Sequence, residues 1–184
     1  PAKPLGCYGD GGAIFTNDIK YAEIFKSIRV HGQGTNKYDN VRIGLNSRLD
    51  TIQASVLLNK LTIFDDELLS RQNISSYYSN SLENLLETPH ISNENFSSWA
   101  QYSLLANDEN SRDEIVELLN ENDIPTAIYY KNIFSKMSFY NCRRSFPISE
   151  NISKRIFSIP MHPYLTESEM DKIIDLIIKY FKKW

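Results

Sequence analysis

The sequence has few cysteines, no long apolar run and no excess of basic residues, and each shortage excludes a class of protein. Cys7 and Cys142 match neither a disulfide framework nor a C-x-x-C metal or redox motif, so we expect two reduced thiols and no metal site. No apolar stretch approaches the roughly 20 residues that span a bilayer, and no signal peptide is recognisable. The formal net charge of −3 does not suit a nucleic-acid-binding surface. We therefore expect a cytoplasmic protein with no membrane or nucleic-acid partner.

What the sequence does contain is typical of a globular domain. Its 184 residues, 41% of them hydrophobic and 23% charged, suffice for one large domain or two small ones. We predict three parts: residues 1–50, bridging helices over residues 51–88, and a smaller α+β body over residues 89–184.

The glycine-rich opening surrounds the lysine that draws most attention. Four glycines lie within residues 6–12, but their spacing is that of neither a P-loop nor a dinucleotide fingerprint. Both motifs also require a helix directly after the glycines, whereas residues 13–16 are predicted as a short strand. The glycines are therefore interpreted as turn residues beside Lys3, which taken alone is typical of a solvated surface lysine.

The pattern of the rest alternates helices, loops and short strands. Residues 17–30 are predicted as a helix with Asn17 as its N-cap, and residues 31–50 as a long polar loop of the kind that often carries function. Apolar stripes predict one bent helix or two helices over residues 49–85. Later elements are expected as strands over residues 98–106 and 124–130, helices opening at Ser111, Glu150 and Thr166, and an extended segment over residues 159–164.

The opening Pro-Ala-Lys-Pro-Leu-Gly-Cys-Tyr-Gly-Asp-Gly-Gly-Ala closely resembles the lysine segment of the DegT/StrS-type sugar-nucleotide aminotransferases. The resemblance continues to the far end of the chain. It implies an α/β fold, namely the C-terminal part of a fold-type I enzyme: the end of the large domain plus a small α+β domain. It also implies that Lys3 is the catalytic residue, which binds pyridoxal phosphate (PLP) as a Schiff base.

The resemblance assigns further site residues. Asn46, in Asn-Ser-Arg-Leu-Asp, would reach the cofactor phosphate of a neighbouring subunit; the alternative is an N-cap cluster that opens the helix after Asp50. Arg48 would contact an anionic substrate or the loop itself. Tyr129 and Tyr130 would face the sugar nucleotide.

Three further positions bear on the same resemblance. Ser135 stands where the family usually has the histidine of Pro-Leu-His, a departure that leaves the identity of the sugar open. His31 is a candidate for a supporting role near the cofactor. His162 is interpreted as part of a rigid, packed connection. Trp99 and Trp184 are interpreted as core or surface packing residues, not as platforms that stack on a base.

The resemblance implies a homodimer with a shared active site that transfers an amino group from glutamate to a nucleotide-linked keto sugar, for lipopolysaccharide, another polysaccharide or a related glycan. One alternative is a PLP-dependent sugar dehydratase, although those relatives replace the lysine with histidine. The other is a non-catalytic binding or dimerisation module. Because the family places further cofactor contacts before its lysine, we expect these 184 residues alone to be inactive.

Overall fold

The structure is a computed structural model that describes residues 3–140 and 144–182, so the predictions for Cys142 and Trp184 lie outside the described residues. The chain divides into two compact units, Pro1–Phe64 and Asp65–Trp184. Within the described part, no helix combines the length and the apolar character needed to cross a bilayer.

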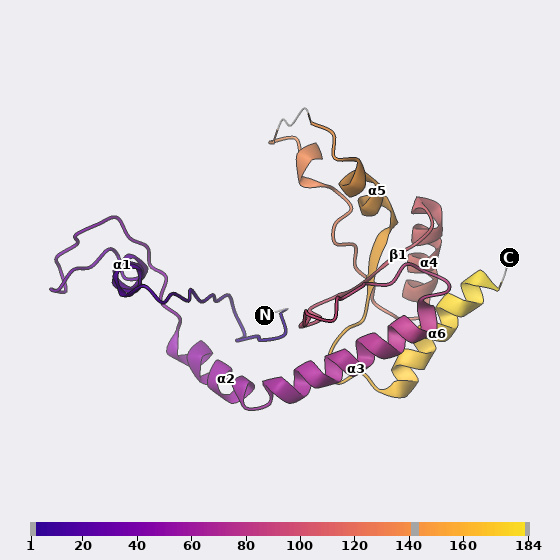
Figure 1. Ribbon diagram of the computed structural model, residues 1–184, viewed down its shortest axis with the longest axis horizontal. Coiled ribbons are helices and arrows are strands. Elements are labelled where there is room, and N and C mark those ends of the chain that lie inside the picture. Colours follow the sequence, from indigo (N-terminus) through magenta and orange to yellow (C-terminus); the bar gives the residue numbers. More distant parts are fainter. Residues whose placement is uncertain (1–2, 141–143, 183–184) are drawn as a thin grey trace. The chain divides into compact units, whose positions relative to one another are not determined.

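The first unit contains two helices joined by a long ordered loop (Figure 1). Helix α1 (Ile19–Arg29) begins after Asp18, whose carboxylate accepts a hydrogen bond from the Lys20 amide at 2.8 Å, so the N-cap lies one residue beyond the predicted Asn17. Helix α2 (Thr51–Leu61) follows the loop over residues 31–50. Neither helix has a fully buried residue.

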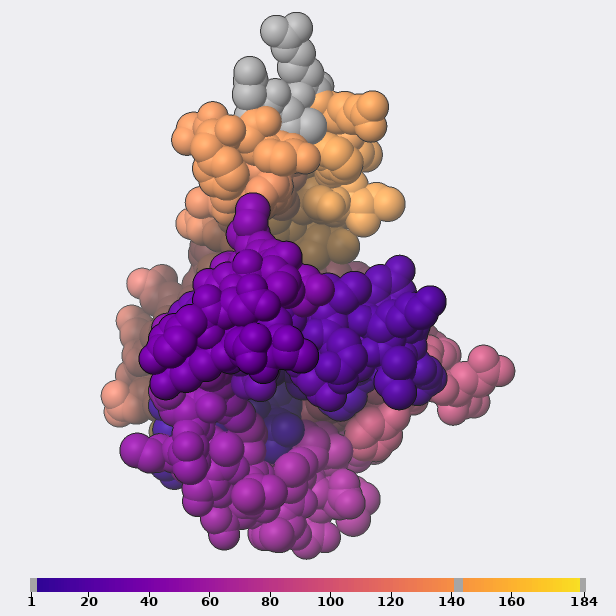
Figure 2. Space-filling model, turned by 90° about the vertical axis from the view of Figure 1, so that its left-hand side faces the viewer, coloured from indigo at the N-terminus to yellow at the C-terminus, as the bar shows by residue number. Residues whose placement is uncertain are grey.

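The strand predicted over residues 13–16 is wrong, because this stretch pairs with no other described segment. A strand needs a neighbour for its N–H and C=O groups, and apolar residues alone do not supply one. Ile14 and Phe15 are exposed instead, on the unit whose outer surface is indigo and purple in Figure 2.

The second unit packs its helices around a small antiparallel sheet. Strands β1 (Tyr102–Leu105) and β2 (Ile156–Ile159) pair from Tyr102 opposite Ile159 to Leu105 opposite Ile156. Single bridges extend the sheet on both sides, from Leu105 to Glu87 and from Ser158 to Ala127. The expected strand over residues 124–130 is therefore reduced to one bridge.

Helices α3 (Phe64–Leu82), α4 (Glu109–Glu121) and α6 (Glu167–Phe181) supply most of the rest of the core of this unit (Figure 1). The helical prediction for residues 49–85 left one bent helix or two open, and the structure has two, α2 and α3. Helix α5 (Pro147–Arg155) and the short 3₁₀ helix η1 (Phe134–Lys136) lie between α4 and β2 in sequence. Helix α4 packs against α5, α6 and β2.

Two helix starts show how capping decides boundaries. The predicted helix start at Thr166 is confirmed, and Thr166 and Glu169 form a capping box that opens α6. The predicted start at Ser111 is wrong, because Asp108 is the N-cap of α4 and accepts from the Ser111 amide at 2.8 Å. An ionised carboxylate is at least as good a cap as a serine hydroxyl and lies one turn earlier.

Candidate functional site

The segment that follows Lys3 is fixed by the first turn of α2. The Cys7 thiol is buried and donates to the Gly9 carbonyl at 3.2 Å. From α2, Gln53 Nε2 lies 3.4 Å from the Asp10 carbonyl and 3.8 Å from Cys7 Sγ. Gly11 lies beside the same thiol, and an added Cβ there would be in van der Waals contact with Sγ at 3.4 Å. The glycine-rich turn is therefore anchored four residues after the lysine.

Lys3 itself is exposed at the end of this anchored turn. Its amine forms no hydrogen bond or ion pair within the described residues. A primary amine on a flexible stem and without a partner is available to bond a carbonyl group.

The loop over residues 31–50 is held in shape by backbone hydrogen bonds. The His31 amide donates to the Leu45 carbonyl at 2.8 Å, and Val41 donates to Gly32 at 2.9 Å. A bridge between Val30 and Asn46 ties the end of the loop to the end of α1. His31 and Gly32 both have positive φ values, 60° and 74°, so the chain reverses there. His31 is exposed, and its supporting role stays a prediction.

Asn46 and Arg48 are exposed on this loop. The loop fixes the Asn46 backbone and leaves its side-chain amide accessible to a ligand or to another subunit. Asp50 is the N-cap of α2 and makes no side-chain capping hydrogen bond, so the structure gives no support to a capping cluster at this position.

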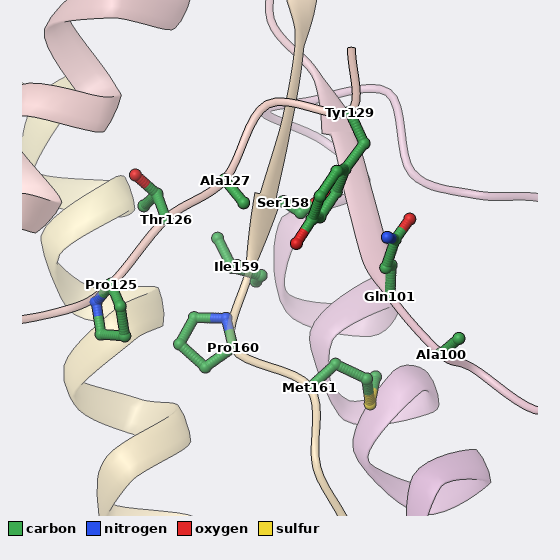
Figure 3. Close-up of a pocket in the computed structure, with 10 residues that line it drawn as sticks. All are labelled: Ala100, Gln101, Pro125, Thr126, Ala127, Tyr129, Ser158, Ile159, Pro160 and Met161. Carbon is green, nitrogen blue, oxygen red and sulfur yellow. The ribbon is translucent and has the colours of Figure 1, made fainter. Parts of the chain in front are cut away.

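Tyr129 lines an open pocket of about 220 Å³ in the second unit (Figure 3). Residues 100–101, 125–127 and 158–161 form its other walls. Figure 3 shows the Tyr129 ring beside the Gln101 side chain at one side of the pocket. Tyr130 is not among the lining residues; it is exposed, and its ring packs edge-on against Tyr129 with centroids 5.4 Å apart.

Ser135 is half-buried in η1, next to a small aromatic cluster. The Phe134 ring packs edge-on against Phe139 and Tyr140, with centroids 5.5 and 4.7 Å apart. This segment has aromatic surface beside the position where the family usually has a histidine. His162 is exposed at the segment that precedes α6, so the interpretation of its side chain as packed is wrong.

Two buried side chains near the pocket act structurally. Trp99 is buried, and its indole N–H donates to Gln72 Oε1 at 3.0 Å, which confirms its interpretation as a packing residue. Arg71 is also buried, and sequence reasoning missed it. Its only sequence signal is a pair of opposite charges, Glu67 and Arg71, at i, i+4 spacing in a predicted helix.

The predicted site residues fall in both units. Lys3, Asn46 and Arg48 belong to the first unit, and Tyr129 and Tyr130 to the second. Each unit thus supplies a reactive or polar group that is accessible to small molecules.

Comparison with known proteins identifies the family of this chain. Residues 1–178 match the model of the DegT/DnrJ/EryC1/StrS aminotransferase family. The chain belongs to this family. The predicted fold class is confirmed, since a DegT/DnrJ/EryC1/StrS aminotransferase from Brucella abortus superposes with a TM-score of 0.92 at 46% identity, over 98% of this chain and 48% of that one.

Curated members of the DegT/DnrJ/EryC1/StrS family are similar along nearly the whole chain. The UDP-2-acetamido-2-deoxy-3-oxo-D-glucuronate aminotransferase of Pseudomonas aeruginosa is 40% identical over 95% of this chain and 48% of its own length. The dTDP-3-amino-3,6-dideoxy-alpha-D-galactopyranose transaminase of Aneurinibacillus thermoaerophilus is 33% identical over 92% and 47%. The chain therefore spans about half the length of the curated relatives it matches.

Proposed function

We propose that this chain forms the C-terminal half of a PLP-dependent aminotransferase that transfers an amino group from glutamate to a nucleotide-linked keto sugar. The observation that carries the proposal is the Lys3 segment, which lies inside a family match that extends over residues 1–178. The substrate class follows from the relatives, whose names specify a UDP-linked 3-oxo sugar acid and a dTDP-linked amino sugar. These two relatives act on sugars linked to different nucleotides, so the proposed substrate is a nucleotide-linked keto sugar as a class.

The residues present fit part of a PLP site. Lys3 offers a partner-free amine for the cofactor aldehyde, and Asn46 offers an exposed amide for its phosphate. A solved relative with 29% sequence identity, DesV from S. venezuelae, is in complex with a ketimine intermediate. When bound, PLP supplies an electron sink for the substrate carbon that loses a proton.

Each predicted residue then has a defined task. Lys3 Nζ would hold the cofactor and move a proton at the substrate carbon that carries nitrogen. Asn46 would donate to the cofactor phosphate of a second subunit, which makes the functional unit a homodimer. Arg48 would pair with an anionic group of the substrate. Tyr129 and Tyr130 would contact the nucleotide sugar. We propose the cytoplasm as the location, where the two cysteines would stay reduced.

The direct test is an assay of the full-length protein with glutamate and a panel of UDP- and dTDP-linked keto sugars. We expect formation of an amino sugar that depends on both PLP and glutamate. Loss of a hydroxyl from the sugar without nitrogen transfer would instead indicate the dehydratase. Binding of the nucleotide sugar without any turnover would indicate the non-catalytic module. We expect the 184-residue chain alone to give no product.

A further inference from the structure

Arg71 joins two backbone segments that are far apart in sequence. Its Nη1 donates to the Trp99 carbonyl at 2.9 Å and to the Met161 carbonyl at 3.1 Å. The residue is 8% exposed, so these bonds form where water does not compete for the donors. Hydrogen bonds from a charged donor are stronger than those from a neutral one, and they fix the positions of both carbonyls.

These carbonyls lie just beyond the end of the β-ladder. The paired register of β1 and β2 ends at Tyr102 opposite Ile159, and beyond it the two backbones no longer pair with each other. The bond to Trp99 is buried and the bond to Met161 partly buried, and a carbonyl withdrawn from water without a donor costs free energy. The guanidinium supplies it, so Arg71 continues the connection between the two segments where the sheet stops.

Burying the charged Arg71 side chain costs desolvation free energy. Burial lowers the pKa of Arg71, while the nearby Glu67 and Tyr164 raise it. The Tyr164 hydroxyl donates to the Glu67 carboxylate, one helical turn before Arg71 in α3. A well-packed apolar side chain would often be at least as stable at such a buried position. The charged group is therefore better explained by what it positions than by stability.

The two segments that Arg71 bonds line the pocket that contains Tyr129. Ala100 and Gln101 follow Trp99 directly and form one wall, while Ile159, Pro160 and Met161 form another (Figure 3). Arg71 holds the carbonyl that directly precedes Ala100 and the carbonyl of Met161, so it bonds the outer end of each wall, beyond the Tyr102–Ile159 pair. The Gln101 amide and the Tyr129 hydroxyl make no side-chain hydrogen bond within the described residues, so both remain available to a ligand.

We propose that Arg71 is a positioning residue for the sugar half of the reaction. It sets the spacing of the two pocket walls and so places Gln101 and Tyr129 against the nucleotide-linked sugar. This inference rests on the proposed aminotransferase function. It assigns the pocket to the second substrate and leaves the reaction with glutamate independent of Arg71.

The test separates the two half-reactions in the full-length enzyme. Arg71→Met keeps most of the apolar stem and removes the donors; Arg71→Lys keeps the charge but lacks the planar guanidinium. We expect the KM for the keto sugar to rise about tenfold or more in Arg71→Met, since misplacement by about 1 Å can cost about 100-fold. The rate at which glutamate alone converts the PLP absorbance is expected to stay within about twofold of wild type.

The matched control is Arg112→Met. Arg112 is a second buried arginine of the same unit, and its Nη1 lies 3.5 Å from the carbonyls of Ser153 and Ile156, outside the pocket lining. We expect this variant to lower the melting temperature without changing the KM for the sugar.

Several results would overturn the inference: an unchanged sugar KM in Arg71→Met, an equal loss in both half-reactions, or an equal rise of KM in Arg112→Met. If Arg71→Met does not fold, Arg71→Lys decides, with a smaller rise of the sugar KM expected and an unchanged KM contradicting the proposal. A wild-type enzyme that forms no amino sugar would instead refute the proposed function, and the inference with it.

Discussion

At the scale of single residues, Gly32 fixes the course of the loop that carries Asn46 and Arg48. Its φ of 74° lies in the left-handed region, and an added Cβ would lie 1.8 Å from the Arg42 carbonyl oxygen. A backbone oxygen cannot move aside as the end of a long side chain can. The conformation and the close approach together require glycine at this position.

We expect Gly32→Ala to lower the free energy of unfolding by about 1–3 kcal/mol, because the new side chain would strain the turn. Gly12→Ala is the matched control: nothing lies within 4 Å of the added Cβ, and its φ is not in the positive region. Denaturant unfolding of both variants measures the difference. Equal stability of the two would show that the loop does not need this turn.

Tyr77 is the residue with the clearest consequence of pH. Its hydroxyl donates to Asp171 Oδ1 at 2.5 Å, and this hydrogen bond is the main reason that its pKa is raised to about 12 from a usual 10.0. The protonated phenol is thus favoured by folding. Its stabilising effect is complete below about pH 10 and is lost as the pH rises towards about 12.

We expect Asp171→Asn to return the Tyr77 pKa towards its usual value, because the carboxylate acceptor is removed. An ultraviolet titration of phenolate absorbance would follow this, with Tyr77→Phe identifying the transition that belongs to Tyr77. Because burial also raises the pKa of Tyr78 and Tyr102, the difference between the two curves is the readout. A titration curve of Tyr77→Phe identical to that of wild type near pH 12 would contradict the assignment.

At the scale of elements, α6 shows how a local signal specifies a helix. Thr166 accepts from the Glu169 amide, and the Glu169 carboxylate accepts from the Thr166 amide at 2.8 Å. This backbone hydrogen bond is the main reason that the pKa of Glu169 is lowered. Buried Met170, Ile173 and Ile177 then give the helix one apolar face.

We expect Thr166→Ala to lower the free energy of unfolding by about 1 kcal/mol, as is typical for loss of an N-cap. Ser168→Ala, in the same exposed first turn, is the control.

The Glu169 carboxylate makes the stability of α6 depend on pH. Because the folded-state pKa of Glu169 is lowered, its contribution to stability is present above the usual pKa of 4.5 and is lost as the pH falls through the folded-state value. The stability difference between wild type and Glu169→Gln should therefore shrink in acid; a constant difference would refute the role of the carboxylate.

The elements predicted correctly from the sequence are those with local causes. The capping box and apolar face of α6 are complete within one stretch, and the stripe over α2 and α3 is nearly so. Strands depend on partners elsewhere: residues 13–16 have the composition of a strand and no partner, whereas β2 was not predicted as a strand and pairs with β1.

The site could be predicted only in part for the same reason. Lys3 and Asn46 stand in contiguous motifs that resemble a family. Arg71 was missed because its partners are the backbone carbonyls of Trp99 and Met161, which no sequence pattern marks. The Gln53 contact to the glycine-rich turn joins residues 46 apart in sequence and was missed likewise.

At the scale of the whole molecule, the two units differ in how much they bury. Among the described residues up to Phe64, only Cys7 and Gly32 are buried. The second unit buries a core contributed by α3, α4, α6 and both strands. Segments with few buried apolar contacts open at a lower free energy than a packed core does.

We therefore expect limited proteolysis of the 184-residue chain to cleave within the first unit and to leave a resistant fragment that begins near Asp65. Mass spectrometry of the surviving fragment gives its first residue. Simultaneous degradation of both units, or early cuts within α4 or α6, would contradict the difference in burial.

The most direct test of the central claim is to locate the bond that PLP makes to the protein. The full-length protein would be incubated with PLP, reduced with borohydride and digested, and the modified lysine identified by mass spectrometry. The proposed function predicts one stoichiometric label on Lys3, absent in Lys3→Arg and retained in Lys20→Arg, which removes another exposed lysine of the same unit. No label, or label spread over many surface lysines with Lys3 unmodified, would contradict it.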